Sequence, residues 1–208
     1  KNLIFLKCPL KKISPTNDQL FKIEMATKFL KDEWVLLLDG DDLFLEKKLK
    51  TLQTLNLNKN KVYLHDHQII TGKTLSNSTK HKNYKKLFLY KFLFNDWPEK
   101  INTSSILLSS KTLKNFYKMA NPYQWKYLAI DVQLVLYFYY KNKFVFLSKI
   151  LTLKRENINN LDKKYSNYFS KIYWLRRLEQ HNMTEKNSHK KNFFDRVITL
   201  FFLKIFIY

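Results

Sequence analysis

Three aspartates within four residues form the stretch of this sequence best suited to chemistry. Asp39, Asp41 and Asp42 follow the apolar run WVLLL at residues 34–38. Carboxylates this close repel one another, and Mg²⁺ or Mn²⁺ relieves that repulsion while keeping coordination positions open for substrate phosphates. The alternative is an acidic turn after a strand, because Asp-Gly is common turn chemistry. Three adjacent acids run against a net charge of +21, which favours a functional site.

The elements around these acids predict where they lie in a fold. The continuous apolar run before them predicts a strand buried on both faces, as in a parallel sheet. Ligands of open α/β sheets bind outside the carboxyl ends of strands, which is where the acids would stand. Further strands are expected at 2–6, 62–70, 104–110 and 144–153, and helices at 45–55, 84–95, 111–119 and 128–140. This alternation predicts an α/β fold.

Composition bounds the class of protein. The 208 residues suffice for one domain with an appendage, and 45% apolar residues can fill a core. Two glycines exclude a Walker loop and a dinucleotide-binding glycine fingerprint, and one cysteine excludes an intrachain disulfide. Only four of the 38 basic residues are arginines. A lysine excess spread over the whole chain is more typical of a solvated surface than of a nucleic-acid site, so we expect no nucleic-acid partner.

Two enzyme classes place an Asp-x-Asp directly after an apolar strand. Phosphatases of the haloacid-dehalogenase type would use Asp39 as nucleophile, but they prefer Thr or Val where this chain has Leu43. Glycosyltransferases of the GT-A fold use the two acids to hold a nucleotide-sugar and its metal. A basic module that binds nucleic acid is an alternative from a different class of function.

The order of four segments resembles the family 2 inverting glycosyltransferases of GT-A fold. The segments are WVLLLDGDD (34–42), INTSSILLSSKTL (101–113), LAIDVQLVL (128–136) and LKRENINNL (153–161). The resemblance covers residues 1–160 and implies a GT-A-like mixed sheet flanked by helices. The strand–helix–strand unit with which that family begins has no counterpart, which predicts a domain that is truncated at its N-terminus.

The resemblance also implies roles for the acidic residues. Asp39 would contact the ribose or base of a nucleotide-sugar donor, Asp41 would bind Mn²⁺ or Mg²⁺ with Asp39, and Asp42 would orient the metal's water ligands. Asp131 aligns with the family's catalytic base, which would deprotonate the acceptor hydroxyl. From the residues alone, Asp131 is better explained as an acid that stabilises a helix N-terminus.

The remaining candidate residues are expected to contact the leaving group or the acceptor. By the resemblance, Arg155 and Lys154 would stabilise the departing diphosphate, and Asp66 and Ser104 would lie on the acceptor side. The expected product is a bacterial surface polysaccharide or lipooligosaccharide, made by inverting transfer to a glycan or lipid-linked acceptor. His65 and His67 flank Asp66, but a metal site there would lack further ligands.

Residues 161–208 predict a helical C-terminal tail with two basic, aromatic stretches, at about 162–181 and 190–207, joined by a polar segment. The last stretch is basic first and apolar afterwards. That pattern suits a helix lying on an anionic membrane, or equally one docked on the domain's own core. No apolar run reaches the roughly 18 residues of a spanning helix. We therefore expect a cytoplasmic protein, peripheral at the inner face of the plasma membrane.

Overall fold

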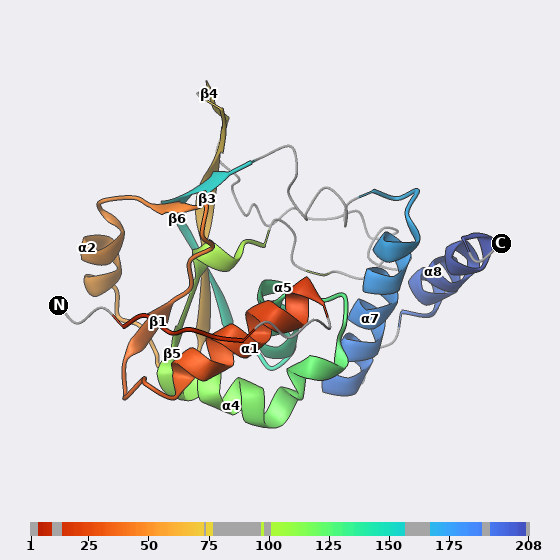
Figure 1. The fold of residues 1–208 in the computed structure, drawn as a ribbon, viewed down its shortest axis with the longest axis horizontal. Helices are drawn as coiled ribbons and strands as arrows, with labels where there is room; N and C mark the ends of the chain where they lie inside the picture. Colours follow the sequence, from red (N-terminus) through yellow and green to blue (C-terminus); the bar gives the residue numbers. More distant parts are fainter. Residues whose placement is uncertain are drawn as a thin grey trace.

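The computed structural model describes residues 4–9, 14–72, 74–76, 97, 101–156, 167–188 and 192–206. A six-stranded sheet lies at its centre (Figure 1), with the strand order β1-β5-β3-β6-β2 and β4 paired with β3. The strands are β1 (Trp34–Leu36), β2 (Leu43–Phe44), β3 (Val62–Thr71), β4 (Thr74–Leu75), β5 (Ile106–Ser109) and β6 (Phe144–Arg155). The sheet is mixed, because β3 and β6 run parallel while every other pair is antiparallel.

Alternating side chains of the central strands fill two cores. On β5, Ile106 and Leu108 join the larger core, while Leu107 joins the smaller core on the opposite face. On β3, Leu64 and Tyr63 divide between the two cores in the same way. A period of two is what a strand with both faces covered requires, since successive side chains point to opposite faces.

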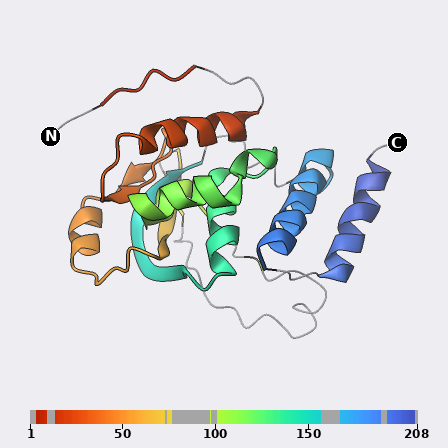
Figure 2. The same cartoon turned by 90° about the horizontal axis from the view of Figure 1, so that it is seen from below.

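Helices cover both faces of this sheet. The helices are α1 (Pro15–Thr27), α2 (Lys48–Gln53), α4 (Ser110–Ala120), α5 (Ile130–Tyr139), α7 (Lys171–Ser188) and α8 (Phe193–Ile205), with short 3₁₀ turns η1 (Thr103–Ser105) and η2 (Pro122–Gln124). Figure 2 shows α1 and α4 side by side on one face, with α8 outermost beyond α7. The larger core lies beneath α1, α4 and α5, and the smaller core includes Leu52 of α2. An α/β fold with a mixed sheet, flanking helices and a helical C-terminal part is thus confirmed.

Two predicted strands differ from the structure. The run that precedes the aspartates is not a central strand buried in a parallel sheet. It is the short strand β1, which stands at the end of the strand order, pairs antiparallel with β5 and is only half-buried. The described residues 4–6 of the strand predicted at 2–6 have no regular structure, and Phe5 is 87% exposed. Apolar composition predicted extended chain in the first case but could not specify the pairing partner. The helix predicted at 84–95 lies outside the described residues.

The C-terminal helices pack directly on the rest of the chain. Glu179 of α7 accepts hydrogen bonds from the backbone N–H groups of Lys126 and Tyr127, at 2.9 and 2.7 Å. Met183 of α7 is fully buried in the larger core, and Thr184 accepts a hydrogen bond from the Trp97 indole. The polar joint predicted at 181–190 is wrong as far as Ser188, because α7 continues through these residues and buries several of them. No helix among the described residues is long and apolar enough to cross a membrane.

A buried ion pair joins α8 to α7. Arg177 donates from Nε and Nη2 to Oδ1 of Asp195, and the Asp195 side chain is fully buried. We predict that Arg177→Ala lowers the free energy of unfolding by about 3 kcal/mol, because it leaves a buried carboxylate without its cation. Urea denaturation of the whole chain measures this loss.

Arg196→Ala is the matched control. Arg196 pairs with Glu185 at 2.9 Å in the same helix pair, but both side chains are about a third exposed. This surface pair should contribute less than about 1 kcal/mol. Equal losses in the two variants would contradict the structural role given to Arg177.

Candidate functional site

The three aspartates form a tight turn directly after β1. The backbone N–H of Asp42 donates to the carbonyl of Asp39 at 3.1 Å, which closes the turn. The N–H of Asp39 donates to Oγ of Ser104 in η1 at 2.9 Å. The turn is therefore fixed to the start of β5, the strand with which β1 pairs, and this places the acids at one end of the sheet.

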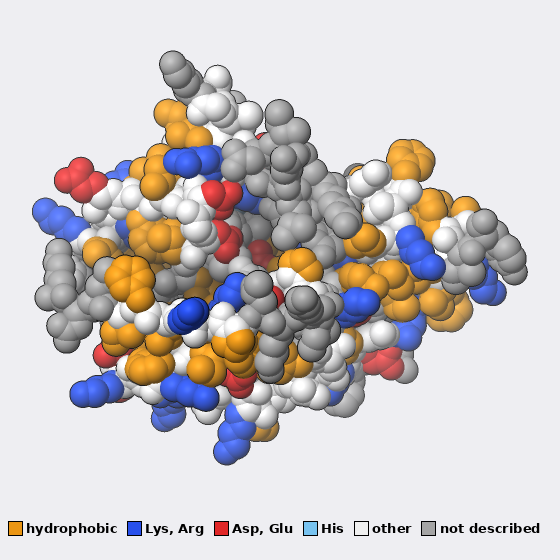
Figure 3. All heavy atoms as spheres, in the orientation of Figure 1, with side chains coloured by type: hydrophobic (Ala, Val, Ile, Leu, Met, Phe, Trp, Pro, Cys, Tyr) orange, Lys and Arg blue, Asp and Glu red, His pale blue; other side chains and the backbone are white. Residues whose placement is uncertain are grey.

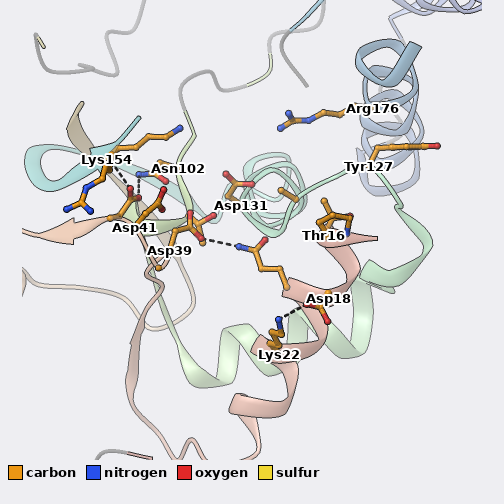
Figure 4. A pocket seen from close by; sticks show the side chains of 17 residues that line it. Thr16, Asp18, Lys22, Asp39, Asp41, Asn102, Tyr127, Asp131, Lys154 and Arg176 are labelled. Carbon is orange, nitrogen blue, oxygen red and sulfur yellow. Dashed lines mark hydrogen bonds and ion pairs between the residues drawn. The ribbon is translucent and has the colours of Figure 1, made fainter. Parts of the chain in front are cut away.

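The acids line a pocket of about 530 Å³. Figure 4 shows Asp39 and Asp41 on one side of Asp131, and Arg176 reaching in from α7 on the other. Acidic side chains gather at the centre of the same face in Figure 3, with basic side chains beside them. Six predicted site residues line the pocket: Asp39, Asp41, Asp42, Asp131, Lys154 and Arg155. Chain segments up to about 115 residues apart in sequence thus meet at one site.

Asp42 is the buried member of the acidic turn. Its Oδ1 accepts a hydrogen bond from the backbone N–H of Arg155 at 2.9 Å, and its Oδ2 accepts one from Asn102 Nδ2 at 3.1 Å. The side chain is only 6% exposed. Asp42 therefore ties the turn to the ends of β5 and β6, and holds Arg155 at the pocket.

The surroundings of Asp39 oppose the ionisation of its carboxyl group. Burial, together with the charges of Asp131, Asp42 and Asp41, raises the pKa of Asp39 to about 6. Gln19 of α1 donates to its Oδ1 at 3.1 Å and supports the carboxylate from the opposite wall. A carboxyl whose pKa is raised by neighbouring carboxylates is stabilised by any cation that enters the pocket.

A buried lysine lies behind the acidic turn. Lys48 is fully buried, and its Nζ donates to the carbonyl of Ser104 at 2.9 Å and to Oγ1 of Thr152 at 3.1 Å. Burial lowers the pKa of Lys48 to about 7, while the charge of Asp42 opposes that shift. Lys48 therefore fastens α2 to η1 and β6, the two elements on either side of the acids. Nothing in its lysine-rich sequence surroundings distinguished it.

Asp131 stands at a helix terminus and also lines the pocket. It lies in the first turn of α5, and its Oδ1 accepts a hydrogen bond from the N–H of Val132 at 2.7 Å. This is the helix-terminus interaction expected of an acid there. The same side chain lines the pocket and raises the pKa of Asp39, so it faces the acidic turn as well.

Three basic side chains face the acids. Lys154 and Arg155 come from the end of β6, and Arg176 comes from α7. Sequence analysis missed Arg176, as it missed Gln19 and Asn102. The signal that could have found it is its residue type, because arginine is scarce in this chain and is suited to binding phosphates and carboxylates.

The residues predicted on the acceptor side lie elsewhere. Ser104 is buried behind the acidic turn, where its hydroxyl accepts the Asp39 N–H, and it does not line the pocket. Asp66 lies on β3 between two buried histidines and is itself 4% exposed. It is not among the residues that line this pocket. The structure therefore brings together the donor-side candidates and Asp131, but not these two.

The donor set suits a hard cation only in part. Among the described residues, no three His, Cys, Asp or Glu side chains are grouped so as to hold a metal ion. The oxygen ligands of Asp39 and Asp41 fit Mg²⁺ or Mn²⁺. The neighbouring carboxylates, which after burial contribute to the raised pKa of Asp39, favour a positive charge here. A cation bound by these two residues would take its remaining ligands from water and a substrate phosphate.

Neither a protein-family model nor a curated protein matches this sequence. We therefore infer a function from the geometry of the pocket and from the order of the segments that line it.

The raised pKa of Asp39 predicts a pH-dependent stability. In the unfolded chain the pKa of this carboxyl is about 3.9, whereas in the folded chain burial and the neighbouring acids raise the pKa to about 6. Between these values the folded state binds more protons, so its stability falls as pH rises from about 4 to 6. Asp39→Asn does not lose stability in this way, because the amide does not titrate. In metal-free buffer, the variant should gain up to about 1 kcal/mol over the wild type at pH 8 relative to pH 5, measured by urea denaturation.

Asp32→Asn is the control for this pH dependence. Asp32 is an exposed acid whose pKa is lowered by a hydrogen bond from Lys59. Its removal should therefore give no such gain at pH 8. Asp39→Asn and the wild type could instead differ in free energy of unfolding by the same amount at both pH values. That result would contradict the raised pKa of Asp39, and with it the proposed repulsion among the carboxylates.

Proposed function

We propose that this chain forms a GT-A-type glycosyltransferase domain of family 2, which transfers a sugar from a nucleotide-sugar to a glycan or lipid-linked acceptor. One observation carries the proposal. All four segments of the family resemblance contribute side chains to the same pocket. They supply the acids of the turn at 39–42, Asn102 and Thr103, Asp131, and the basic pair Lys154 and Arg155.

The arrangement of charge suits a diphosphate leaving group. Asp39 and Asp41 lie beside the start of β5 and the end of β6, and they would hold Mn²⁺ or Mg²⁺ together with substrate phosphate oxygens. Such a cation would neutralise charge that develops on the diphosphate. Lys154 and Arg155, which lie beside the acids, would add cationic stabilisation of the same charge.

Asp131 is the residue proposed to take the acceptor proton. It faces the pocket from the start of a rigid helix whose interior is buried. As the bond from the anomeric carbon to the diphosphate breaks, the acceptor oxygen bonds to that carbon and its proton passes to the Asp131 carboxylate. A displacement of this kind inverts the anomeric configuration. The acceptor would enter beside Asp131, on the side lined by Arg176 and Thr16 (Figure 4).

The two alternatives receive less support from the pocket. A phosphatase would use Asp39 as nucleophile, but phosphatases of that type prefer Thr or Val where this chain has Leu43, and Leu43 is not among the residues that line the pocket. A nucleic-acid module would need basic and aromatic side chains along a binding surface, whereas five aspartates line this pocket: Asp18, Asp39, Asp41, Asp42 and Asp131. The proposed enzyme is cytoplasmic and acts in bacterial surface polysaccharide or lipooligosaccharide synthesis.

The donor site predicts a nucleotide- and metal-dependent stabilisation. We expect one nucleoside diphosphate of a panel to raise the melting temperature in the presence of Mn²⁺, because a ligand that binds only the folded state stabilises it. A ligand at a hundred times its Kd contributes about 2.7 kcal/mol. Asp41→Asn should abolish the shift, whereas Asp32→Asn, which removes an exposed acid, should retain it. A shift that survives in Asp41→Asn would overturn the assignment of this site.

The catalytic step makes a separate prediction. Asp131→Asn should lower the rate of sugar transfer by a factor on the order of 10²–10⁴, because the acceptor hydroxyl loses its base. The same variant should keep the Mn²⁺-dependent thermal shift with the nucleoside diphosphate. Release of nucleoside diphosphate from a nucleotide-sugar, measured with acceptor present, reports the rate. Unchanged transfer by Asp131→Asn would refute the role of this residue.

A further inference from the structure

The outer helix α8 has its polar side facing the protein and its apolar side facing solvent. Its inward positions, four residues apart, are Asp195, Thr199 and Leu203, which are 0%, 0% and 7% exposed. Apart from Lys204, its exposed positions are apolar and 41–71% exposed: Phe193, Phe194, Val197, Leu200, Phe201 and Ile205. A helix that packs only on its own domain shows the opposite pattern, with its apolar stripe inward.

Specific polar contacts fix the helix in this orientation. Arg177 binds Asp195 with two hydrogen bonds, and the hydroxyl of Thr199 lies 3.2 Å from Nε2 of His181. Burial lowers the pKa of His181 and so favours its neutral form. Rotation of α8 to bury its aromatic side would break the ion pair between Asp195 and Arg177. The polar contacts between α7 and α8 therefore hold the apolar face of α8 outward.

The apolar surface continues beyond α8. Phe202 of α8 stacks on Trp174 of α7, with ring centroids 4.4 Å apart. The Trp174 indole donates to the carbonyl of Tyr168, which connects α8 to the corner before α7. At this corner Tyr168 and Phe169 are 65% and 85% exposed. Figure 3 shows hydrophobic side chains gathered over the α7–α8 end of the molecule.

The charges around this surface are of one sign. Every exposed charged residue of α7 and α8 is a lysine: Lys171, Lys186 and Lys204. The acids of the two helices are less exposed, and each has its own partner. Asp195 pairs with Arg177, Glu185 pairs with Arg196, and Glu179 accepts backbone N–H groups.

We propose that α8 and the Tyr168–Phe169 corner dock the protein on an anionic lipid surface. Exposed aromatic and aliphatic side chains would enter the boundary between headgroups and acyl chains, and the lysines would lie at the headgroups. A second copy of the chain fits less well, because each copy carries a net charge of +21 and would repel the other. Docking in this way is independent of the chemistry in the pocket.

Vesicle sedimentation with the whole chain tests the proposal. The protein should sediment with vesicles of phosphatidylglycerol and phosphatidylcholine at low salt. It should sediment much less with vesicles of phosphatidylcholine alone, and less at high salt, because salt screens the lysines. Phe201→Ser should weaken binding to the anionic vesicles roughly tenfold, since insertion of one Phe side chain removes its apolar surface from water.

Phe29→Ser provides the matched control. Phe29 is 54% exposed, compared with 60% for Phe201, but it lies just after α1, outside the helix pair. Both variants should keep the wild-type melting temperature, and Phe29→Ser should bind vesicles as the wild type does. Equal weakening by the two substitutions would overturn the proposal. So would absence of binding to anionic vesicles, equal binding to neutral ones, or a concentration-dependent dimer that hides the α8 face.

Discussion

Mutual repulsion among four carboxylates is the constraint on which the rest of the structure depends. Asp39, Asp41, Asp42 and Asp131 line one pocket, and burial together with the charges of the other three raises the pKa of Asp39. The surrounding structure offsets this repulsion with fixed donors. Asn102 and the Arg155 N–H hold Asp42, while Gln19 supports Asp39. These donors come from different elements, so the turn can keep its acids together only when the whole fold is formed.

The residues of the site could be predicted where their chemistry was concentrated in sequence. Three acids after an apolar run stand out in a basic chain, and the strand–helix alternation predicted the α/β fold around them. Asp131 and the pair Lys154 and Arg155 came only from the order of resembling segments. The structure brings all of these side chains to one pocket, although their roles there are proposals.

Other features depend on tertiary contacts that no local pattern records. The apolar character of residues 34–38 predicted a central parallel strand, but β1 is antiparallel and stands at the end of the strand order. The sequence does not distinguish Lys48 from the other lysines, because its burial behind Ser104 depends on tertiary contacts. The tail pattern allowed α8 to face either way, and the ion pair between Arg177 and Asp195 decides that its aromatic side faces outward.

The central claim is that the acidic turn binds a divalent cation together with a nucleoside diphosphate. Electron paramagnetic resonance of Mn²⁺ tests it most directly, because the hexa-aquo ion and the protein-bound ion give different spectra. With one nucleoside diphosphate of a panel, we predict that the protein removes free Mn²⁺ signal in a one-to-one ratio, beyond the loss that the nucleotide alone causes. Titrations that match the nucleotide alone for every member of the panel would contradict the account.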